Sequence, residues 1–365
     1  MNSLSGFVAS FFVDWKRITL GSNRSDIAAL AIDLNAGSPQ NSRYTSQLSM
    51  KILVTGAAGF IGSRLSKALL SRGDEVVGLD NFDPYYDLNL KNRHLLDLEH
   101  PKFRLVRGDL RDEILVRQLF ESENFHAVAH IGAMAAVRFS VQFPLLYSGV
   151  NVQGTVNLLD AARRTSNPRC VLASTGSVYG RDTPVPFSEA ASAVSPLAPY
   201  PASKRSMELF AHSFAHLYRL RTTILRFFNV YGPHGRPDMM PWQWTQKISR
   251  NEEITLFNGG HLQRDWTYID DIVSGFIAAL DADLSWEIFN LGCGVPVENL
   301  EFVRILERFV GQSARVLDAP CPASEPLETF ADISKARRVL GYDPQIRVEQ
   351  GLERFVKWMR EESHI

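Results

Sequence analysis

Short apolar runs alternate with helix-length amphipathic segments from Met50 onward. Each run is continuous instead of alternating, which is typical of strands that are covered on both faces of a sheet. Between the runs, Ile61–Ser71 and Val152–Arg163 repeat apolar residues at helical spacing. The pattern predicts an α/β fold with a doubly wound, mostly parallel sheet. The six predicted strands are Lys51–Thr55, Glu75–Asp80, Phe103–Val106, Ala127–Ile131, Cys170–Ser174 and Thr223–Phe228.

Residues 1–49 differ from the rest, being rich in Ser and Asn without a sustained period. We expect a separate leader, either a disordered tail or an extension upstream of a true start at Met50. A short amphipathic anchor is the alternative. It would be built on Phe7, Val8, Phe11, Phe12 and Trp15.

Composition and charge narrow the function classes. With 365 residues, of which 45% are hydrophobic, the chain can bury a sizeable core. Its 39 Lys and Arg against 40 Asp and Glu leave no basic field that would attract nucleic acid. No apolar run approaches the roughly 20 residues that span a bilayer. The three cysteines, Cys170, Cys293 and Cys321, form no CxxC pair, so we expect no metal site and a reducing, cytoplasmic compartment.

A glycine-rich segment, TGAAGFIG, directly follows the first predicted strand. Gly56, Gly59 and Gly62 allow a tight turn, a close approach to a pyrophosphate and close packing of a helix on the sheet. Phe60 and Ile61, at the entry to the helix predicted over Ile61–Ser71, are expected to bind the cofactor as well, and the helix N-terminus would face the anion. A purely structural turn is the alternative, but the strand before it and the helix after it favour a dinucleotide site of the Rossmann type.

Acidic residues end the next two predicted strands. Asp80 stands where a carboxylate accepts hydrogen bonds from the adenosine ribose, and it would repel a 2′-phosphate. Because Asn81 supplies no compensating cation, NAD is favoured over NADP. Asp109, followed by Leu110, stands where an acid would receive the adenine amino group. An N-cap of the following helix is the alternative role, and it does not exclude the adenine contact.

Tyr200 and Lys204 stand four apart in YPASK, which places them one turn apart on one helix face. A phenol with a pKa near 10 is a poor base, but a neighbouring cation favours the phenolate. It can then take a hydroxyl proton while hydride leaves the same carbon. Such a pair is common on solvated helix faces. Its position after a dinucleotide site is what favours a catalytic role. Upstream, Thr175 and Ser177 offer hydroxyls at the end of the fifth strand.

Together, the segments TGAAGFIG, YPASK, STGSVYG (174–180), LRFFNVYGP (225–233) and RDWTYIDD (264–271) resemble the extended short-chain dehydrogenase/reductases that act on nucleotide sugars. The resemblance covers about residues 50 to 360. GRPDM (235–239) and DNFDPYYD (80–87) are most similar to UDP-glucuronate 4-epimerases. The resemblance implies NAD as cofactor, a UDP-sugar substrate and a homodimer whose interface uses helices such as 152–163.

The resemblance also implies roles for single residues. Tyr200 would be the base, Lys204 would lower its pKa and bind the nicotinamide ribose, and Thr175 would hydrogen-bond the sugar C4 oxygen, with Ser177 close by. Arg264 would meet the UDP phosphates. Asn229 and Arg236 would contact the sugar, the latter in a loop similar to the uronate-contacting loop of the family.

Three reactions share a 4-keto sugar, and the residues near Thr175 distinguish them. A 4,6-dehydratase needs an Asp-Glu pair where this chain has Thr175-Gly176-Ser177, and a decarboxylase of the family has Glu where Ser177 stands. An epimerase needs neither. We therefore expect NAD-dependent C4 epimerisation of UDP-glucuronate to UDP-galacturonate. UDP-glucose 4-epimerase, UDP-glucuronate decarboxylase and an NAD-binding sensor or scaffold are the alternatives.

Substrate choice is expected to depend on Arg236. Opposite a neutral hydroxymethyl group its guanidinium would lack a charged partner, at a cost of roughly 2–4 kcal/mol. Three departures from the resemblance keep UDP-glucose open: Asn229 in place of Thr, His234 in place of Trp, and the lack of a Gly-Asp pair in Ala319–Thr329.

The expected organisation is a leader (1–49), an NAD-binding Rossmann domain (50–228) and a smaller C-terminal α/β region that mainly binds substrate (229–360). Part of 264–292 is expected to return to the Rossmann domain. A late helix is predicted over Leu352–Met359.

Overall fold

The computed structural model describes residues 49–322 and 325–365. The expectations for the leader, including the amphipathic anchor, concern residues outside this range, apart from Ser49.

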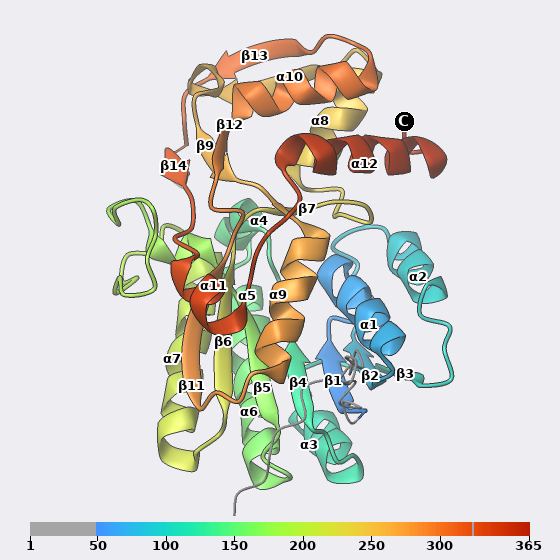
Figure 1. Ribbon diagram of the computed structural model, residues 1–365, viewed down its shortest axis with the longest axis vertical. Helices are drawn as coiled ribbons and strands as arrows, with labels where there is room; N and C mark the ends of the chain where they lie inside the picture. The colour runs from blue at the N-terminus through green and yellow to red at the C-terminus, as the bar shows by residue number, and fades with distance from the viewer. Residues whose placement is uncertain (1–48, 323–324) are drawn as a thin grey trace, which may run out of the picture. The chain divides into compact units, whose positions relative to one another are not determined.

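Seven parallel strands form the main sheet, in the order β11-β6-β5-β4-β1-β2-β3 (Figure 1). The order reverses between β1 and β4, which is the arrangement of a doubly wound Rossmann-like sheet, so the predicted fold class is confirmed. All six predicted strands are present, with ends that differ by at most one residue, and β11 was not predicted. The strands are β1 (Lys51–Thr55), β2 (Glu75–Asp80), β3 (Phe103–Arg107), β4 (Ala127–His130), β5 (Arg169–Thr175), β6 (Thr222–Phe227) and β11 (Trp286–Leu291).

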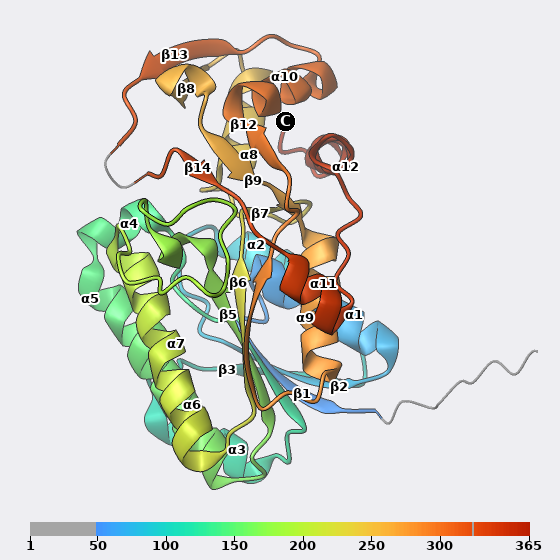
Figure 2. The ribbon, with the colours of Figure 1, turned by 60° about the vertical axis from the view of Figure 1, so that its left-hand side comes forward.

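Helices cover both faces of this sheet (Figure 2). One face carries α3 (Glu113–Ser122), α6 (Gly154–Arg164) and α7 (Pro199–Tyr218), and the other carries α1 (Phe60–Arg72), α9 (Ile269–Asp281) and α11 (Ser334–Leu340). Along β1, Ile52 and Val54 join the core on the α1 side, whereas Leu53 joins the core on the α6 side. Burial on both faces explains why the strands are continuously apolar. Among the described residues, no helix is long and apolar enough to cross a membrane.

The helix predicted over Val152–Arg163 begins differently in the structure. A π-helical turn, η1 (Ser148–Gln153), follows α5 (Pro144–Tyr147) and leads directly into α6. This turn points Asn151 inward, where its amide bonds the backbone N–H and carbonyl of Met134, both at 2.9 Å. These bonds join residues 17 positions apart, so the periodicity of the sequence does not reveal them.

The second half of the chain builds a smaller region over the carboxyl ends of the main strands (Figures 1 and 2). The predicted late helix lies within α12 (Val348–Glu361). Although α9 and β11 follow part of this region in the sequence, they return to the main sheet. The elements of the region are β7 (Val230–Tyr231), α8 (Met240–Ser249), β8 (Glu253–Phe257), β9 (Gln263–Asp265), β10 (Thr267–Tyr268), β12 (Pro296–Glu298), α10 (Asn299–Val310), β13 (Arg315–Ala319), β14 (Glu328–Thr329) and α12 (Val348–Glu361).

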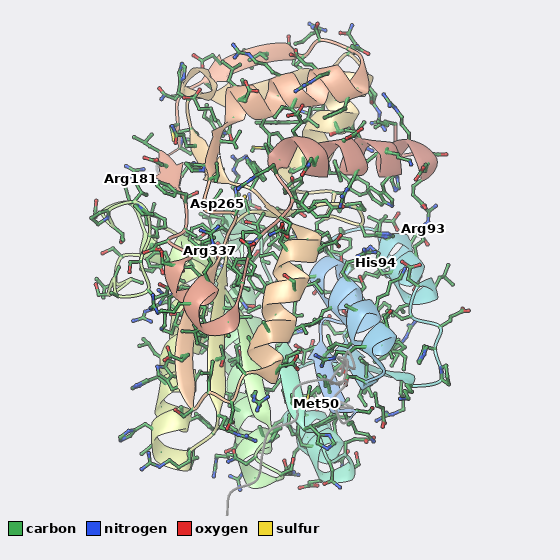
Figure 3. The ribbon with its side chains drawn as sticks, in the orientation of Figure 1. Met50, Arg93, His94, Arg181, Asp265 and Arg337 are labelled. Carbon is green, nitrogen blue, oxygen red and sulfur yellow. The ribbon has the colours of Figure 1, made fainter. Side chains whose placement is uncertain are left out.

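Asp265 joins this region to the main sheet (Figure 3). The side chain is fully buried, and its Oδ1 accepts hydrogen bonds from the N–H of Cys293 (2.7 Å) and the hydroxyl of Thr267 (3.2 Å). Its Oδ2 accepts from the N–H of Gly294 (3.0 Å) and of Ala331 (3.1 Å). Because Cys293 and Gly294 directly follow β11, one carboxylate fixes the end of that strand against β9.

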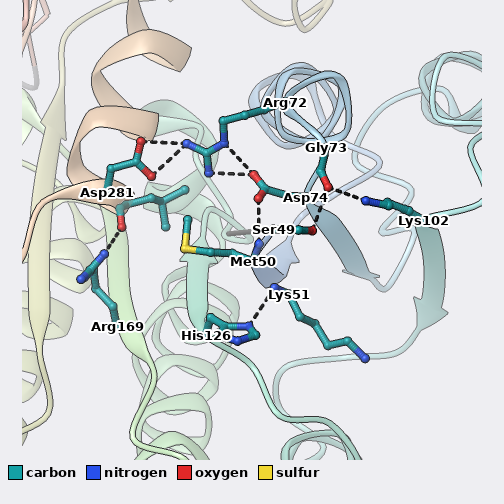
Figure 4. A network of polar contacts seen from close by, with 11 residues as sticks. Ser49, Met50, Lys51, Arg72, Gly73, Asp74, Lys102, His126, Arg169 and Asp281 are labelled. Carbon is teal, nitrogen blue, oxygen red and sulfur yellow. Dashed lines mark hydrogen bonds and ion pairs between the residues drawn. The ribbon is translucent and has the colours of Figure 1, made fainter. Parts of the chain in front are cut away.

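A second polar network lies at the amino ends of the strands (Figure 4). Asp74, which is 3% exposed, accepts hydrogen bonds from the N–H of Met50 (2.9 Å) and from Nε of Arg72 (2.7 Å). The same guanidinium pairs with Asp281 at the end of α9 (2.8 Å). The start of β1 is thus tied to α1 and α9, on the side of the sheet away from the cavity described next.

Candidate active site

A cavity of about 830 Å³ lies at the carboxyl ends of the main strands. Every site residue predicted from the sequence lines it, with the exception of Lys204. The lining residues among the predictions are Gly56, Gly59, Phe60, Ile61, Gly62, Asp80, Asn81, Asp109, Leu110, Thr175, Ser177, Tyr200, Asn229, Arg236 and Arg264.

The glycine-rich turn leaves room for an anion. Gly56 has φ +70°, and a Cβ there would lie 2.9 Å from the backbone of Gly132. A Cβ on Gly62 would lie 2.0 Å from the carbonyl oxygen of Gly56, so the helix can approach the turn this closely only without a side chain. No side chain caps α1 at Gly59, and no acidic residue stands in its first turn. The free N–H groups and the positive helix end fit a dinucleotide pyrophosphate.

Asp80 has a partner that the sequence did not point to. Its Oδ2 accepts the N–H of Ala58 (3.1 Å), and its Oδ1 accepts the N–H of Phe82 (2.8 Å) and the ammonium of Lys91 (3.3 Å). Lys91 lies on α2 (Leu88–Leu96), is buried, and lines the same cavity. Since a carboxylate offers about four acceptor sites, Oδ2 keeps room for a ribose hydroxyl.

His94, also on α2, supports the glycine-rich turn (Figure 3). Its Nδ1 lies 2.9 Å from the carbonyl oxygen of Ala58. Burial lowers the pKa of His94, although the bond to Ala58 opposes the shift. The imidazole is therefore neutral near pH 7 and adds no charge beside the anion site.

Asp109 is held by Arg111 and Asn81. Its two oxygens accept from the Arg111 side chain at 3.0 and 2.8 Å, and Oδ2 also accepts from the amide of Asn81 at 2.9 Å. The Arg111 hydrogen bonds hold the pKa of Asp109 far below its usual range. The prediction that Asp109 caps the next helix is wrong, because Asp112 caps α3 by accepting the N–H of Leu115. A contact from Asp109 to adenine stays a prediction.

Tyr200 lies in the first turn of α7, next to the end of β5. Its backbone N–H donates to Oγ of Ser140 (3.0 Å) on α4 (Val137–Gln142), and its side chain is 9% exposed. Burial raises the pKa of Tyr200, whereas a hydrogen bond with Thr175 and the positive charge of Arg236 lower it. Thr175 in turn donates to Oγ of Ser177 (3.2 Å). Phenol and hydroxyl are thus placed together on the cavity wall.

Lys204 lies one turn further along α7 and is directed behind the cavity wall. Its ammonium donates to the carbonyl of Ala173 (2.9 Å) and is almost fully buried. Burial lowers the pKa of Lys204 to about 8, and the carboxylate of Glu208 opposes this shift. Thr175 and Arg236 lower the pKa of Tyr200, and the expected effect of Lys204 on that pKa stays a prediction.

A buried ion pair that sequence reasoning missed lies behind Lys204. Glu208, on the next turn of α7, pairs bidentately with Arg226 of β6 at 3.0 and 2.7 Å. It also accepts from Oγ of Ser174 (2.6 Å) and from Arg205 (2.8 Å). Because these bonds join α7 to β5 and β6, they fix the register between Tyr200 and Thr175.

Arg236 has a carboxylate partner within its own loop. Its guanidinium pairs with Asp238 through two hydrogen bonds, of 2.9 and 2.6 Å. The expectation that a neutral sugar leaves this guanidinium without a charged partner is therefore wrong. Its charge is already matched before any ligand enters.

Arg264 lies on β9, in the smaller region, and lines the cavity. It is 7% exposed, donates to the carbonyls of Gln263 (2.8 Å) and Leu327 (3.2 Å), and pairs with Glu325 (3.2 Å). Burial lowers the pKa of Arg264, and Glu325 opposes that shift. The stretch Ala319–Thr329, which lacks a Gly-Asp pair, thus still places an acid against this arginine.

Comparison with known proteins identifies the family. A model of the NAD dependent epimerase/dehydratase family matches residues 52–292. The chain belongs to this family. Members are NAD-dependent enzymes, so the cofactor predicted from the glycine-rich turn and Asp80 is confirmed, as is the resemblance to nucleotide-sugar epimerases.

Several family members are closely similar. UDP-glucuronate 4-epimerase 4 of Arabidopsis thaliana is 42% identical over 335 residues, which cover 87% of this chain and 76% of that protein. UDP-glucuronate 4-epimerase of Thermodesulfobacterium geofontis is 40% identical over 311 residues, covering 85% and 96%. The crystal structure of UDP-glucuronic acid 4-epimerase from Bacillus cereus, in complex with UDP-glucuronic acid and NAD, superposes with a TM-score of 0.81 at 34% identity, covering 86% and 100%.

Replacing Asp80 tests the basis of cofactor preference. Asp80→Ala removes the charge that repels a 2′-phosphate and leaves Lys91 without its carboxylate, so we expect the ratio of NADP to NAD affinity to rise by about tenfold or more. Calorimetric titration of both dinucleotides measures the ratio. Adding Lys91→Met should reverse the gain, and Glu99→Ala, an exposed acid outside the cavity, is the control. An unchanged ratio in Asp80→Ala would contradict this role.

The lowered pKa of Lys204 predicts a pH limit. An amine is charged below its pKa, so the ammonium of Lys204 is lost as the pH rises through about 8. We expect kcat/KM to fall above that pH, because the cavity then loses a positive charge behind Tyr200. A pH profile measures the fall, and Lys204→Met should lack it. If kcat/KM of Lys204→Met also falls above this pH, a group other than Lys204 is titrating.

Proposed function

We propose that this enzyme epimerises UDP-glucuronate to UDP-galacturonate at C4. The observation that carries the proposal is one cavity in which Tyr200 and Thr175 face the Arg236 guanidinium, with no carboxylate in Thr175-Gly176-Ser177. The plant and bacterial relatives, which are named as UDP-glucuronate 4-epimerases, support it.

Residues of this chain transfer the proton and hold the substrate. Tyr200 takes the C4 hydroxyl proton and later returns it, while Thr175 holds the C4 oxygen by a hydrogen bond. NAD, when bound, accepts hydride from C4 and gives it back. Lys204 keeps positive charge behind the phenol. Arg236 lowers the pKa of Tyr200 and so favours its phenolate.

The two ends of the cavity receive different parts of the ligands. We assign Gly56, Gly59, Gly62 and the first turn of α1 to the dinucleotide pyrophosphate. Asp80, with Asn81 beside it, is assigned to the adenosine ribose, and Asp109 with Leu110 to adenine. Arg264 is assigned to the UDP diphosphate by charge. The expected contact of Lys204 with the nicotinamide ribose stays a prediction, because its ammonium bonds the carbonyl of Ala173 behind the cavity wall. Ser177 and Asn229 contact the sugar. These assignments divide the chain into a cofactor part (50–228, with 269–291) and a mainly substrate-binding part (the remainder of 229–360).

UDP-glucose 4-epimerase is the second candidate. Because Asp238 already neutralises Arg236, a neutral hydroxymethyl group at C6 would not leave a buried guanidinium unpaired. The pair of Arg236 and Asp238 therefore reduces the expected difference in binding free energy between UDP-glucuronate and UDP-glucose.

Deuterium at C4 of the substrate tests the proposal. UDP-glucuronate, UDP-glucose and UDP-N-acetylglucosamine are incubated separately with the enzyme and NAD, and NMR identifies the products. We expect UDP-galacturonate as the favoured product, with deuterium retained at C4, because hydride returns to the carbon it left.

Tyr200→Phe should lower kcat by about 10²-fold with little change in UDP binding, since it removes only the general base.

Each other outcome of this assay identifies one alternative. A UDP-pentose indicates a decarboxylase, and preferred conversion of UDP-glucose indicates a galactose-type epimerase. NAD binding without turnover of any sugar indicates a sensor or scaffold. Loss of deuterium to solvent would contradict hydride return.

We also propose that two copies associate through α7. Outer residues of this helix, Leu209 (56% exposed), Phe210 and Leu217 (65%), are apolar, and Leu145 on the neighbouring α5 is 86% exposed. Exposed apolar patches of this kind mark association surfaces, and a homodimer covers the same patch on both copies. The sequence pointed to 152–163, whereas the described α6 carries no large, exposed apolar residue.

The free thiols of all three cysteines support a cytoplasmic location.

Negative charges introduced on the exposed face of α7 should prevent the two copies from associating. The parent enzyme is expected to sediment as a dimer, and Leu209→Glu with Leu217→Glu as a monomer, because four carboxylates would be buried in the interface. Val316→Glu, on the exposed strand β13, is the matched control. A monomeric parent, or a variant that stays dimeric, would contradict the proposed interface.

A further inference from the structure

The pair between Arg236 and Asp238 uses only one edge of the guanidinium. Nε donates to Oδ1 at 2.9 Å and one Nη2 donates to Oδ2 at 2.6 Å. A guanidinium has five N–H groups, so one on Nη2 and two on Nη1 remain. The remaining N–H of Nη2 and one N–H of Nη1 form a second edge that can bind another carboxylate. Both side chains are partly accessible, at 20% for Arg236 and 24% for Asp238, and both line the cavity.

Asp238 is itself held from a distant segment. The hydroxyl of Tyr85, 153 positions earlier in the chain, donates to its Oδ2 at 3.0 Å. The ring of Tyr85 packs on Phe139 (4.9 Å between centroids) and lies 6.0 Å from the Arg236 guanidinium. Burial works against ionisation, but the Arg236 hydrogen bonds hold the pKa of Asp238 below its usual range. The carboxylate is therefore charged and fixed on two sides.

The orientation of a C6 carboxylate matters in this reaction. A 4-ketouronate loses carbon dioxide when its C5–C6 bond lies perpendicular to the carbonyl plane. That bond then breaks, its electron pair moves into the C4 carbonyl to form an enolate, and C5 takes a proton from water. A guanidinium that can swing would let the carboxylate rotate into this geometry, whereas a fixed one would not.

We propose that Asp238 is a positioning residue: it holds Arg236 by one edge so that the other edge fixes the substrate's C6 carboxylate and suppresses its loss as carbon dioxide. This inference rests on the proposed function. Tyr85 contributes by fixing Asp238, so the segment that follows β2 takes part in the sugar site. The role of Asp238 requires its negative charge, because a neutral amide cannot accept two charge-assisted bonds from the same guanidinium edge without turning an N–H toward it.

Three variants separate positioning from a structural role. Asp238→Asn keeps the size and removes the charge, Tyr85→Phe removes only the hydroxyl, and Arg236→Ala removes the clamp itself. Asp182→Asn, an exposed acid outside the cavity lining, is the matched control. Two quantities are measured with C6-labelled UDP-glucuronate: the fraction of turnovers that release labelled carbon dioxide, and kcat/KM relative to UDP-glucose.

We expect Asp238→Asn to raise the carbon dioxide fraction by roughly tenfold, because small misplacements of a binding group have large effects on a reacting geometry. Its kcat/KM should fall by about tenfold for UDP-glucuronate and by less than about threefold for UDP-glucose. Tyr85→Phe should change both quantities in the same direction by a smaller factor, and Arg236→Ala by a larger one. Asp182→Asn should match the parent enzyme.

The opposing outcomes are distinct. If the parent enzyme converts UDP-glucuronate, and Asp238→Asn and Tyr85→Phe leave the carbon dioxide fraction unchanged or lower kcat/KM equally for both sugars, the positioning role is overturned and the proposed function stands. If Asp238→Asn does not fold, Tyr85→Phe alone decides. If the parent enzyme does not convert UDP-glucuronate, the proposed function and this inference both fail.

Discussion

The arrangement of this enzyme depends on the carboxylate of Asp265. Three backbone N–H groups from other segments and the hydroxyl of nearby Thr267 converge on it, and its side chain is fully buried. Burial raises the pKa of Asp265, and these bonds oppose the shift. Its neighbour in sequence is Arg264, so the interaction that joins the smaller region to the main sheet also places a cation over the carboxyl ends of the strands.

The positions of the other cavity residues depend on the main sheet and on one buried ion pair. The main sheet brings the glycine-rich turn, Asp80 and Thr175 to one edge, because parallel strands end together. The Glu208–Arg226 pair aligns α7 with β5 and β6, and so brings Tyr200 to Thr175. Replacing a buried ion pair of this kind by one partner alone costs about 3–5 kcal/mol, so its removal would affect stability as well as alignment.

The fold and the identity of the lining residues could be predicted because both depend on local pattern. Strands buried on two faces are continuous in apolar residues, and parallel strands place their ends together. The partners could not be predicted. Lys91 meets Asp80, Asp238 meets Arg236 and Tyr85, and Glu325 meets Arg264 through contacts that the fold sets. No spacing in the sequence marks the link from Tyr85 to Asp238, across 153 positions. Strand β11 was missed because WEIFNL mixes polar and apolar residues at an edge of the sheet.

The short segment from Asp80 to Tyr85 has a consequence for the kinetics of the cofactor. Asp80 stands in the dinucleotide half of the cavity, and Tyr85 bonds the sugar loop through Asp238. A dinucleotide that leaves past this segment must disturb a contact made on the sugar side. We therefore expect the enzyme to retain its cofactor over many catalytic cycles. Such retention suits a reaction in which the electrons taken from a substrate return to the same molecule and none is exchanged with the surrounding pool.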